Sequence, residues 1–207
     1  MSRFFVYKLT TDNGGAPCVT PDLLTLALCK PAVRSTADLG DWIFGFGDNQ
    51  YIGNRLIYIA KVTGKLVDGA YYGARTFWSR PDCIYRWTKA GALKPKAKPR
   101  YHGSAEDTRK DVGFHPYYRR ANVLLSTDFR YFGGAQCAVT IPTVIAEFVL
   151  HITQGHRGEN TLHPLKRTLR RFQAEVWGNY PDQMKLGNPF HGTDRAKCYT
   201  GEHREIC

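Results

Sequence analysis

Acidic residues are scarce in this sequence. Its 207 residues include 18 Asp and Glu against 29 Lys and Arg, so the formal net charge at neutral pH is +11. A basic excess of this size attracts polyanions, and nucleic acid is the usual partner of a folded basic domain. The alternative is that the charge serves solubility alone. We predict DNA, or another nucleic acid or nucleotide, as a partner.

Long apolar runs are also lacking. The most apolar stretch, residues 135–148, is interrupted by Gln136, Thr140, Pro142 and Glu147, which argues against a membrane-spanning helix. The first eight residues do not have the charged, apolar and small-residue regions of a signal peptide. We therefore expect a cytoplasmic protein without a membrane partner. Its hydrophobic content of 43% predicts a folded chain.

Cysteine pairs at metal-binding spacing are absent. None of the six cysteines forms a Cys-x-x-Cys pair or lies at zinc-finger spacing from a histidine. Residues 101–118 contain several possible ligands whose spacing matches no metal motif: His102, Glu106, Asp107, Asp111 and His115. We predict no metal and no other cofactor. Cys29, Cys83 and Cys137 lie in apolar segments, and we expect them to be reduced and buried.

Familiar enzyme motifs are missing as well. The sequence has no Walker loop, no His-Glu-x-x-His, no zinc-deaminase signature and no dinucleotide-binding fingerprint. The catalytic residues therefore stay unknown at this point. If the protein is an enzyme, Asp12, His115 and Asp128 are the candidate acid–base groups, and Cys18 is the candidate thiol nucleophile.

The sequence does contain two strong strand patterns that follow each other. In residues 40–47, Trp42, Phe44 and Phe46 alternate with other residues, which predicts a strand with one aromatic face. Residues 55–62 are apolar on nearly both faces, as in a central strand. Further strands are predicted at 3–10, 23–29 and 121–126, with a short helix at 31–37. The fold class is α+β, with a mixed or barrel-like sheet.

The last third of the sequence has helical periodicity. A helix is predicted at residues 140–153, and a second at 162–177 with Thr161 as its cap. Leu165, Leu169, Phe172 and Val176 of the second helix are expected to face inward, and Lys166, Arg167, Arg170 and Arg171 outward. We therefore predict a core at residues 1–134 and a helical extension at 135–207 packed on the same domain.

Candidate binding residues flank the predicted strands. Asp12 precedes two adjacent glycines, which allow the backbone to approach a phosphate or a base closely. Ser126 ends a buried strand and Asp128 follows it, at a place where polar sites are often displayed. The basic, proline-broken segment 89–100 is expected to be an exposed phosphate contact. The full candidate set is Asp12, Lys30, Arg34, Trp42, Phe46, Asp82, Tyr85, Ser126, Asp128 and Tyr131.

Several segments together carry a family resemblance. Asp12–Cys18, Cys29–Arg34, Gly40–Gly45, Arg80–Tyr85 and Val123–Gly133 together resemble the nucleotide modification associated domain family of phages and bacteria. The Gly40–Asp41 step, which precedes a strand ending Ile59-Ala60-Lys61-Val62, is also similar to PUA-like barrels of the EVE, ASCH and YTH types. The resemblance implies a PUA-like mixed β-barrel or strongly bent sheet, with the C-terminal helices packed on it.

Three functions are compatible with these observations. The first is a binding module that holds a nucleobase, modified or flipped, in an aromatic and polar pocket as part of a phage or bacterial DNA base-modification system. The second is an enzyme that itself modifies or processes a nucleobase or nucleotide. The third is an accessory subunit that scaffolds partner proteins of such a system. The sequence does not choose between DNA, RNA and free nucleotide.

Overall fold

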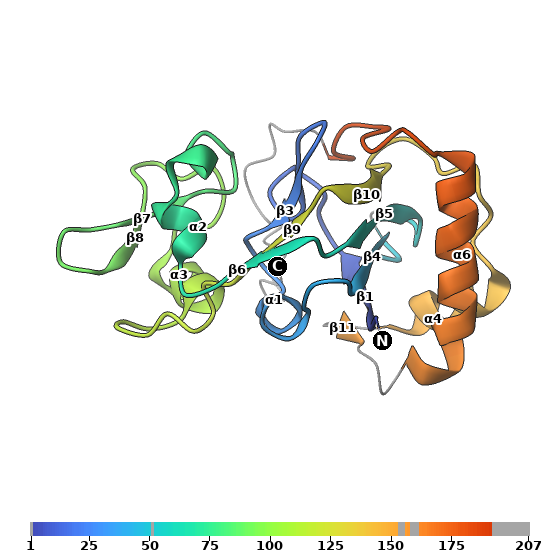
Figure 1. Ribbon diagram of the computed structural model, residues 1–207, viewed down its shortest axis with the longest axis horizontal. Coiled ribbons are helices and arrows are strands. Elements are labelled where there is room, and N and C mark those ends of the chain that lie inside the picture. The colour runs from blue at the N-terminus through green and yellow to red at the C-terminus, as the bar shows by residue number, and fades with distance from the viewer. Residues whose placement is uncertain (1, 51, 153–155, 158–161, 192–207) are drawn as a thin grey trace.

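The largest element of the fold is a mixed five-stranded sheet. The computed structural model describes residues 2–50, 52–152, 156–157 and 162–191, and Figure 1 shows its elements. The strand order is β10-β5-β4-β1-β11, with β10 at Asp128–Tyr131, β5 at Leu56–Lys61, β4 at Trp42–Gly47, β1 at Phe4–Leu9 and β11 at His156–Arg157. β1 and β4 run parallel, and the other neighbours are antiparallel. The prediction that residues 55–62 form a central strand is confirmed.

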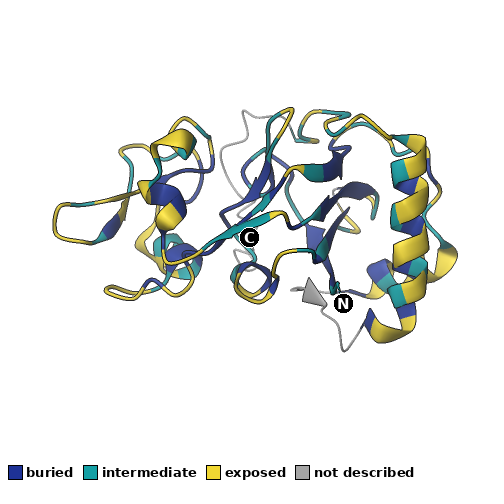
Figure 2. Cartoon of the chain, in the orientation of Figure 1, coloured by how far each residue is buried: buried dark blue, intermediate teal, exposed yellow. Residues whose placement is uncertain are grey.

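Side chains alternate across this sheet as the sequence predicts. Phe4, Val6, Phe44 and Phe46 lie on one face, together with the buried residues of helices α4 (Thr143–His151) and α6 (Lys166–Asn179). The inward residues predicted for α6 are buried, and Figure 2 shows its exposed residues on the side away from the sheet. The predicted cap at Thr161 lies outside the described residues. The aromatic face of β4 is thus part of the core beneath the helices.

A second sheet continues from the first. Its order is β2-β3-β9-β6, with β2 at Cys18–Val19, β3 at Leu24–Leu26, β9 at Val123–Ser126 and β6 at Gly64–Leu66. The β5–β10 pair of the first sheet and the β6–β9 pair of the second are joined through residues 62–63 and 127. Two chain segments therefore pass together from one sheet to the other. The described strands do not close into a barrel, so the predicted PUA-like barrel is not confirmed, whereas the α+β class is.

The remaining elements form a lobe beside the second sheet. They are α2 (Ala70–Gly73), the 3-10 turn η1 (Arg75–Phe77), the hairpin of β7 (Tyr85–Trp87) with β8 (Leu93–Pro95), and α3 (Ala105–Val112). The lobe has a core of its own that includes Tyr72, Tyr85 and Val112. Helix α1 (Pro31–Thr36) lies between the lobe and the five-stranded sheet (Figure 1).

Two further observations bear on the sequence predictions. The 3-10 turn η2 (His163–Leu165) leads directly into α6, so the regular helix begins slightly later than predicted. Helix α4 begins at Thr143, later than the predicted start at residue 140, and its buried side is formed by Ile145 and Val149. No helix among the described residues has the length and apolar character needed to cross a membrane.

Candidate functional site

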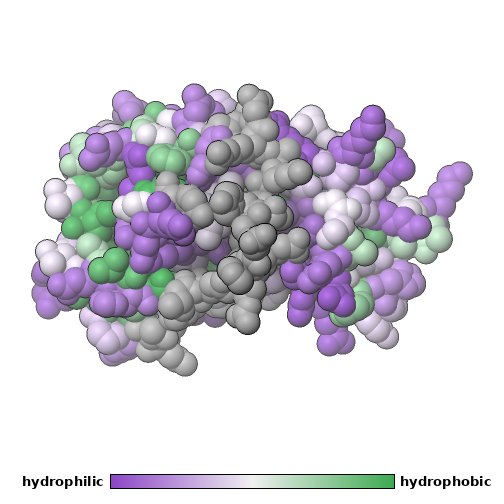
Figure 3. All heavy atoms as spheres, turned by 180° about the vertical axis from the view of Figure 1, so that it is seen from behind, coloured by the Kyte–Doolittle hydropathy of each residue, from purple (hydrophilic) through white to green (hydrophobic). Residues whose placement is uncertain are grey.

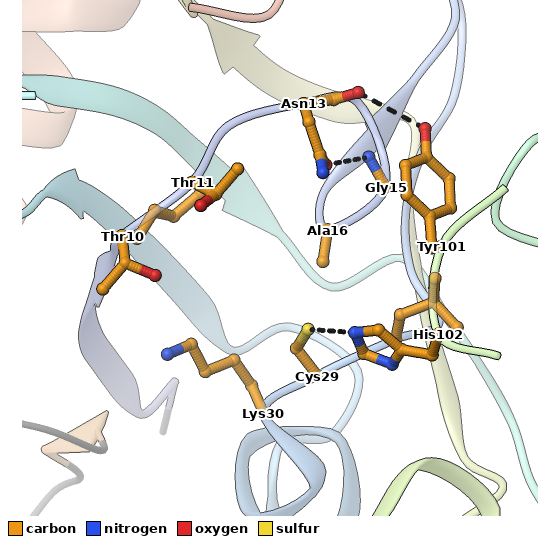
Figure 4. A pocket seen from close by; sticks show the side chains of 11 residues that line it. Thr10, Thr11, Asn13, Gly15, Ala16, Cys29, Lys30, Tyr101 and His102 are labelled. Carbon is orange, nitrogen blue, oxygen red and sulfur yellow. Dashed lines mark hydrogen bonds between the residues drawn. The ribbon is translucent and has the colours of Figure 1, made fainter. Parts of the chain in front are cut away.

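A pocket opens where the end of β1, the following loop and the start of α1 meet the chain that enters α3. The pocket is narrow and partly open to solvent. The lining residues come from three separate segments: 9–16, 28–30 and 101–102. Figure 4 shows the amine of Lys30 and the thiol of Cys29 on one side of the pocket, with Thr10 and Thr11 across from the lysine. The thiol, amine and imidazole groups of the site line this one pocket.

Cys29, His102 and Asp111 form a hydrogen-bonded chain at this pocket. The Sγ atom of Cys29 lies 3.5 Å from Nε2 of His102, a contact drawn in Figure 4. The other ring nitrogen, Nδ1, lies 2.6 Å from Oδ2 of Asp111. The thiol and the imidazole line the pocket, whereas the carboxylate is fully buried behind them. A nucleophile, a base and a group that orients the base are arranged in this order in thiol-dependent enzymes.

The imidazole of His102 has an unusual proton affinity. Burial lowers the pKa of His102, but its hydrogen bonds to Asp111 and Cys29 outweigh burial and raise that pKa to about 11. The ring is therefore positively charged at neutral pH. A positive imidazolium next to a cysteine favours the thiolate form, which is the nucleophilic form.

Asp111 is held by several partners in addition to His102. Its Oδ1 accepts a hydrogen bond from the backbone N–H of Cys29 at 3.0 Å, and its Oδ2 accepts one from the Tyr85 hydroxyl at 2.8 Å. The buried guanidinium of Arg34 lies 3.8 Å from the same carboxylate. Arg34 also donates to the carbonyl oxygens of Cys29, Asp111, Arg120 and Asn122. These bonds fix the start of α1 against α3, and so fix the thiol against the imidazole.

The backbone at the thiol has a rare conformation. Cys29 and Lys30 both have positive φ angles, 55° and 44°, although neither is glycine. Such strain is retained in proteins mainly where the surrounding contacts impose it, and functional sites are common places for it. The Lys30 side chain extends from this backbone so that its Nζ lies 5.0 Å from the centre of the Tyr7 ring. Burial lowers the pKa of Lys30, and the charge of Cys29 opposes that effect.

The loop between β1 and β2 forms the opposite wall. Asn13 Oδ1 accepts the N–H of Gly15 at 3.1 Å, and the Tyr101 hydroxyl donates to the Asn13 carbonyl at 3.3 Å. A Cβ atom on Gly15 would lie 2.9 Å from the Tyr101 ring, so the glycine lets this ring pack closely against the loop. The wall thus combines an aromatic ring with amide and carbonyl groups that are hydrogen-bonded to one another.

Some of the predicted site residues lie in or next to this pocket. Lys30 lines it, and Tyr85 and Arg34 hold Asp111 from behind. Asp12 and Tyr131 meet each other: both carboxylate oxygens of Asp12 lie 2.9 Å from the Tyr131 hydroxyl, and one accepts the N–H of Phe190 at 3.0 Å. Burial raises the pKa of Asp12 to about 6, although these hydrogen bonds lower it.

Other predicted residues have structural partners elsewhere. Trp42 packs edge-on against Trp177 at 5.2 Å between ring centres, and Trp177 donates to Asp128 at 2.9 Å. Phe46 is in the core under the helices, and Asp82 is fully buried next to Arg80, Thr25 and Tyr71. Ser126 bonds to the backbone of Asp128, and His115 is exposed on the lobe. Burial raises the pKa of the Cys18 thiol to about 12, which makes it a poor nucleophile at neutral pH.

The sequence interpretation missed the three residues at the centre of the site. Cys29 ends an apolar segment and resembles a small core residue, yet it is partly exposed in the pocket. His102 and Asp111 suggest only metal ligands when they are met in the sequence. Among the described residues, no three His, Cys, Asp or Glu side chains are grouped so that they could hold a metal ion.

Comparison with known proteins gives one match. The family described as nucleotide modification associated domain 2 matches residues 1–190, which is most of the chain and includes every residue of the pocket. No curated protein and no solved structure matches the chain.

Proposed function

Because the chain belongs to the nucleotide modification associated domain 2 family, we propose that it is an enzyme that modifies or processes a nucleobase or nucleotide, with Cys29 as the nucleophile. The observation that supports this most directly is the chain of contacts from the Cys29 thiol through His102 to the buried Asp111. The family places the chain among proteins associated with nucleotide modification systems, and the geometry supplies a chemical role within such a system.

In the proposed reaction Cys29 reacts as the thiolate, next to a His102 ring that is already protonated. The sulfur of Cys29 then forms a bond to an electron-poor carbon of the substrate, a carbonyl-type or conjugated ring carbon. The π bond of that carbon breaks, and its electron pair moves to the neighbouring oxygen, nitrogen or conjugated carbon. His102 donates its proton there and becomes neutral, while its hydrogen bond to Asp111 holds the ring in place. The ammonium of Lys30, in the same pocket, stabilises the negative charge as it develops.

A base-binding module without turnover is the second candidate. Its support is the wall of Asn13 and Tyr101, which offers a ring and polar groups. In this case the aromatic face of β4 contributes no cage, because Phe44 and Phe46 are buried beneath α4 and α6. Under both candidates, DNA and other nucleic acids, and the proteins of a phage or bacterial base-modification system, are the proposed partners.

The two candidates are separated by a conversion assay. Mononucleotides and short oligonucleotides with ordinary and modified bases are incubated with the wild-type protein, and the nucleosides and the intact protein are then weighed by mass spectrometry. We expect a converted nucleoside or a covalent adduct with the wild type, and neither with Cys29→Ser. Cys137→Ser is the matched control, since Cys137 packs against the helical core instead of the pocket. Binding by both proteins without any conversion would support the reader and contradict the enzyme.

A further inference from the structure

The basic charge of the chain is concentrated in one segment. Residues 64–122 contain thirteen Lys and Arg against five Asp and Glu, a net charge of +8 out of the total of +11. This segment comprises β6 and the whole lobe. Two of its five acidic residues, Asp82 and Asp111, are buried with cationic partners, so they reduce the charge at the surface very little. Figure 3 shows hydrophilic residues over much of this end of the molecule.

Exposed aromatic rings lie among these charges. Phe114 and Tyr117, in the turn after α3, are 67% and 69% exposed, the highest values among the aromatic residues that the structure describes. Each ring has an arginine over it: Arg109 lies 5.9 Å from the Phe114 ring centre, and Arg119 lies 5.5 Å from that of Tyr117. Exposing large apolar rings to water is unfavourable, so such rings often mark a binding surface. Next to them, guanidinium groups can pair with phosphates and stack on aromatic bases.

The lobe is also hollowed next to these rings. A groove with an empty volume of about 730 Å³, open to solvent, lies between β8 and α3, and is lined by Leu93, Glu106, Arg109, Phe114 and His115 among others. Lys94 of β8 is exposed, and so are Lys98 and Arg100 in the basic loop that joins β8 to the start of α3. We call these features together, from Lys94–Arg100 to Arg109, Phe114, Tyr117 and Arg119, the lobe surface.

The lobe surface is continuous in sequence with the pocket. Arg100 lies 5.8 Å from the ring centre of Tyr101, and Tyr101 and His102 line the pocket that contains Cys29. At the other end of α3, Asp111 contacts Nδ1 of His102. The exposed turn that contains Phe114 begins just after this helix. The basic loop therefore leads, along the chain, directly to two residues that line the pocket.

We propose that the lobe surface binds single-stranded nucleic acid and presents one unpaired base to the Cys29 pocket. The choice of a single strand follows from the rings, because exposed Phe114 and Tyr117 can stack only on bases that are not already stacked in a duplex. The positive loop tracks the phosphates without reading sequence. The binding surface stands on the lobe alone, whereas presentation of a base for conversion rests on the proposed enzymatic function.

Binding is tested with the full chain and fluorescent twelve-nucleotide homopolymers. Oligothymidylate and oligouridylate distinguish DNA from RNA, and a duplex of the same length tests the preference for single strands. We expect Phe114→Ala/Tyr117→Ala to weaken single-strand binding about tenfold or more. Arg109→Gln/Arg119→Gln should weaken it too and make the dependence of log affinity on log salt shallower, by about 0.7 for each phosphate that the protein no longer neutralises.

Helix α6 provides the matched control. Arg170 and Arg171 are exposed, and α6 lies at the opposite end of the molecule from the lobe (Figure 1). Arg170→Gln/Arg171→Gln removes the same charge and should change affinity less than twofold. Three outcomes would contradict the proposal that the lobe surface binds single strands. They are equal weakening by both arginine pairs, unchanged binding in the aromatic variant, and tighter binding of the duplex than of the single strand.

The experiment also separates this inference from the proposed function. All affinities are measured in the Cys29→Ser background, where no conversion takes place. Binding that depends on Phe114 and Tyr117, combined with no conversion by the wild type, upholds the lobe surface and contradicts the enzyme. Conversion of free nucleotides by a protein that does not bind single strands would uphold the enzyme and contradict the lobe surface as a binding site.

Discussion

The Nδ1 atom of His102 lies 2.6 Å from the Oδ2 atom of Asp111. The two residues lie at opposite ends of the segment that contains α3. Ser104 caps that helix and exchanges hydrogen bonds with Asp107, so the start of α3 is fixed just after the histidine. Asp111 is in its last turn. One short helix therefore sets the distance between the imidazole and the carboxylate, and the buried Arg34 brings Cys29 to them.

Loss of the Asp111 charge should destabilise the fold strongly. Asp111→Asn keeps the shape of the side chain but leaves the buried Arg34 without its anionic partner. We expect the free energy of unfolding in urea to fall by about 3 to 5 kcal/mol. Glu106→Gln is the control on the same helix, since its ion pair with Lys110 is half-exposed, and we expect a change within about 0.5 kcal/mol. Equal effects of the two substitutions would contradict the account of Asp111.

The contribution of His102 to stability should depend on pH. The pKa of this group is raised from 6.5 to about 11 in the folded protein, so the folded state holds the proton more tightly than the unfolded chain does. The difference in unfolding free energy between the wild type and His102→Gln is then largest below pH 6.5. It should decrease steadily as the pH rises from 7 to 10. A difference that stays flat over this range would show that the folded ring is already neutral at pH 7.

Asp12 should show a similar trend at lower pH. Burial raises the pKa of this carboxyl from 3.8 to about 6, so its proton also stabilises the folded state. Relative to Asp12→Asn, the wild type should lose about 2.5 kcal/mol of stability as the pH rises from 4 to 7, with little change above that. Paired urea titrations at pH 4, 5, 6 and 7 measure the trend. A flat difference would mean that Asp12 is ionised throughout.

Gly45 should tolerate no side chain. A Cβ atom there would lie 2.3 Å from a ring carbon of Tyr58 and 2.9 Å from Leu9. The Tyr58 ring cannot move freely, because its hydroxyl is hydrogen-bonded to that of Tyr7 at 2.6 Å. We expect Gly45→Ala to cost about 1 to 3 kcal/mol or more. Gly178→Ala, in α6 with no atom within 4 Å of the new Cβ, should instead stabilise the protein by up to about 1 kcal/mol, as thermal unfolding would show.

Much of the secondary structure follows from periodicity. Strand β4 is predictable because Trp42, Phe44 and Phe46 alternate regularly with other residues. Helix α6 is predictable because its apolar stripe, from Leu165 to Val176, repeats over several helical turns. The transition from one sheet to the other is not. It occurs at residues 62–63 and 127, where the pattern carries no local signal and only the pairing partners change.

The site is hidden from the sequence for a related reason. Cys29 ends an apolar strand segment, and His102 lies 73 residues further along the chain in a segment without periodicity. Six cysteines and seven histidines allow many pairings, and spacing alone favours none of them. What selects this pair is the buried Arg34, which bonds to carbonyl groups on both sides of the contact. In the sequence, Arg34 itself resembles a surface cation.

The most direct measurement of the central claim is the rate at which iodoacetamide alkylates Cys29 at pH 7, followed by peptide mass spectrometry. The buried Cys18 and Cys83 serve as internal references. The account predicts that Cys29 reacts much faster than both, and that His102→Gln slows Cys29 at least tenfold while leaving the references unchanged. A Cys29 rate that is unaffected by His102→Gln would contradict it, because the imidazole would then have no part in activating the thiol.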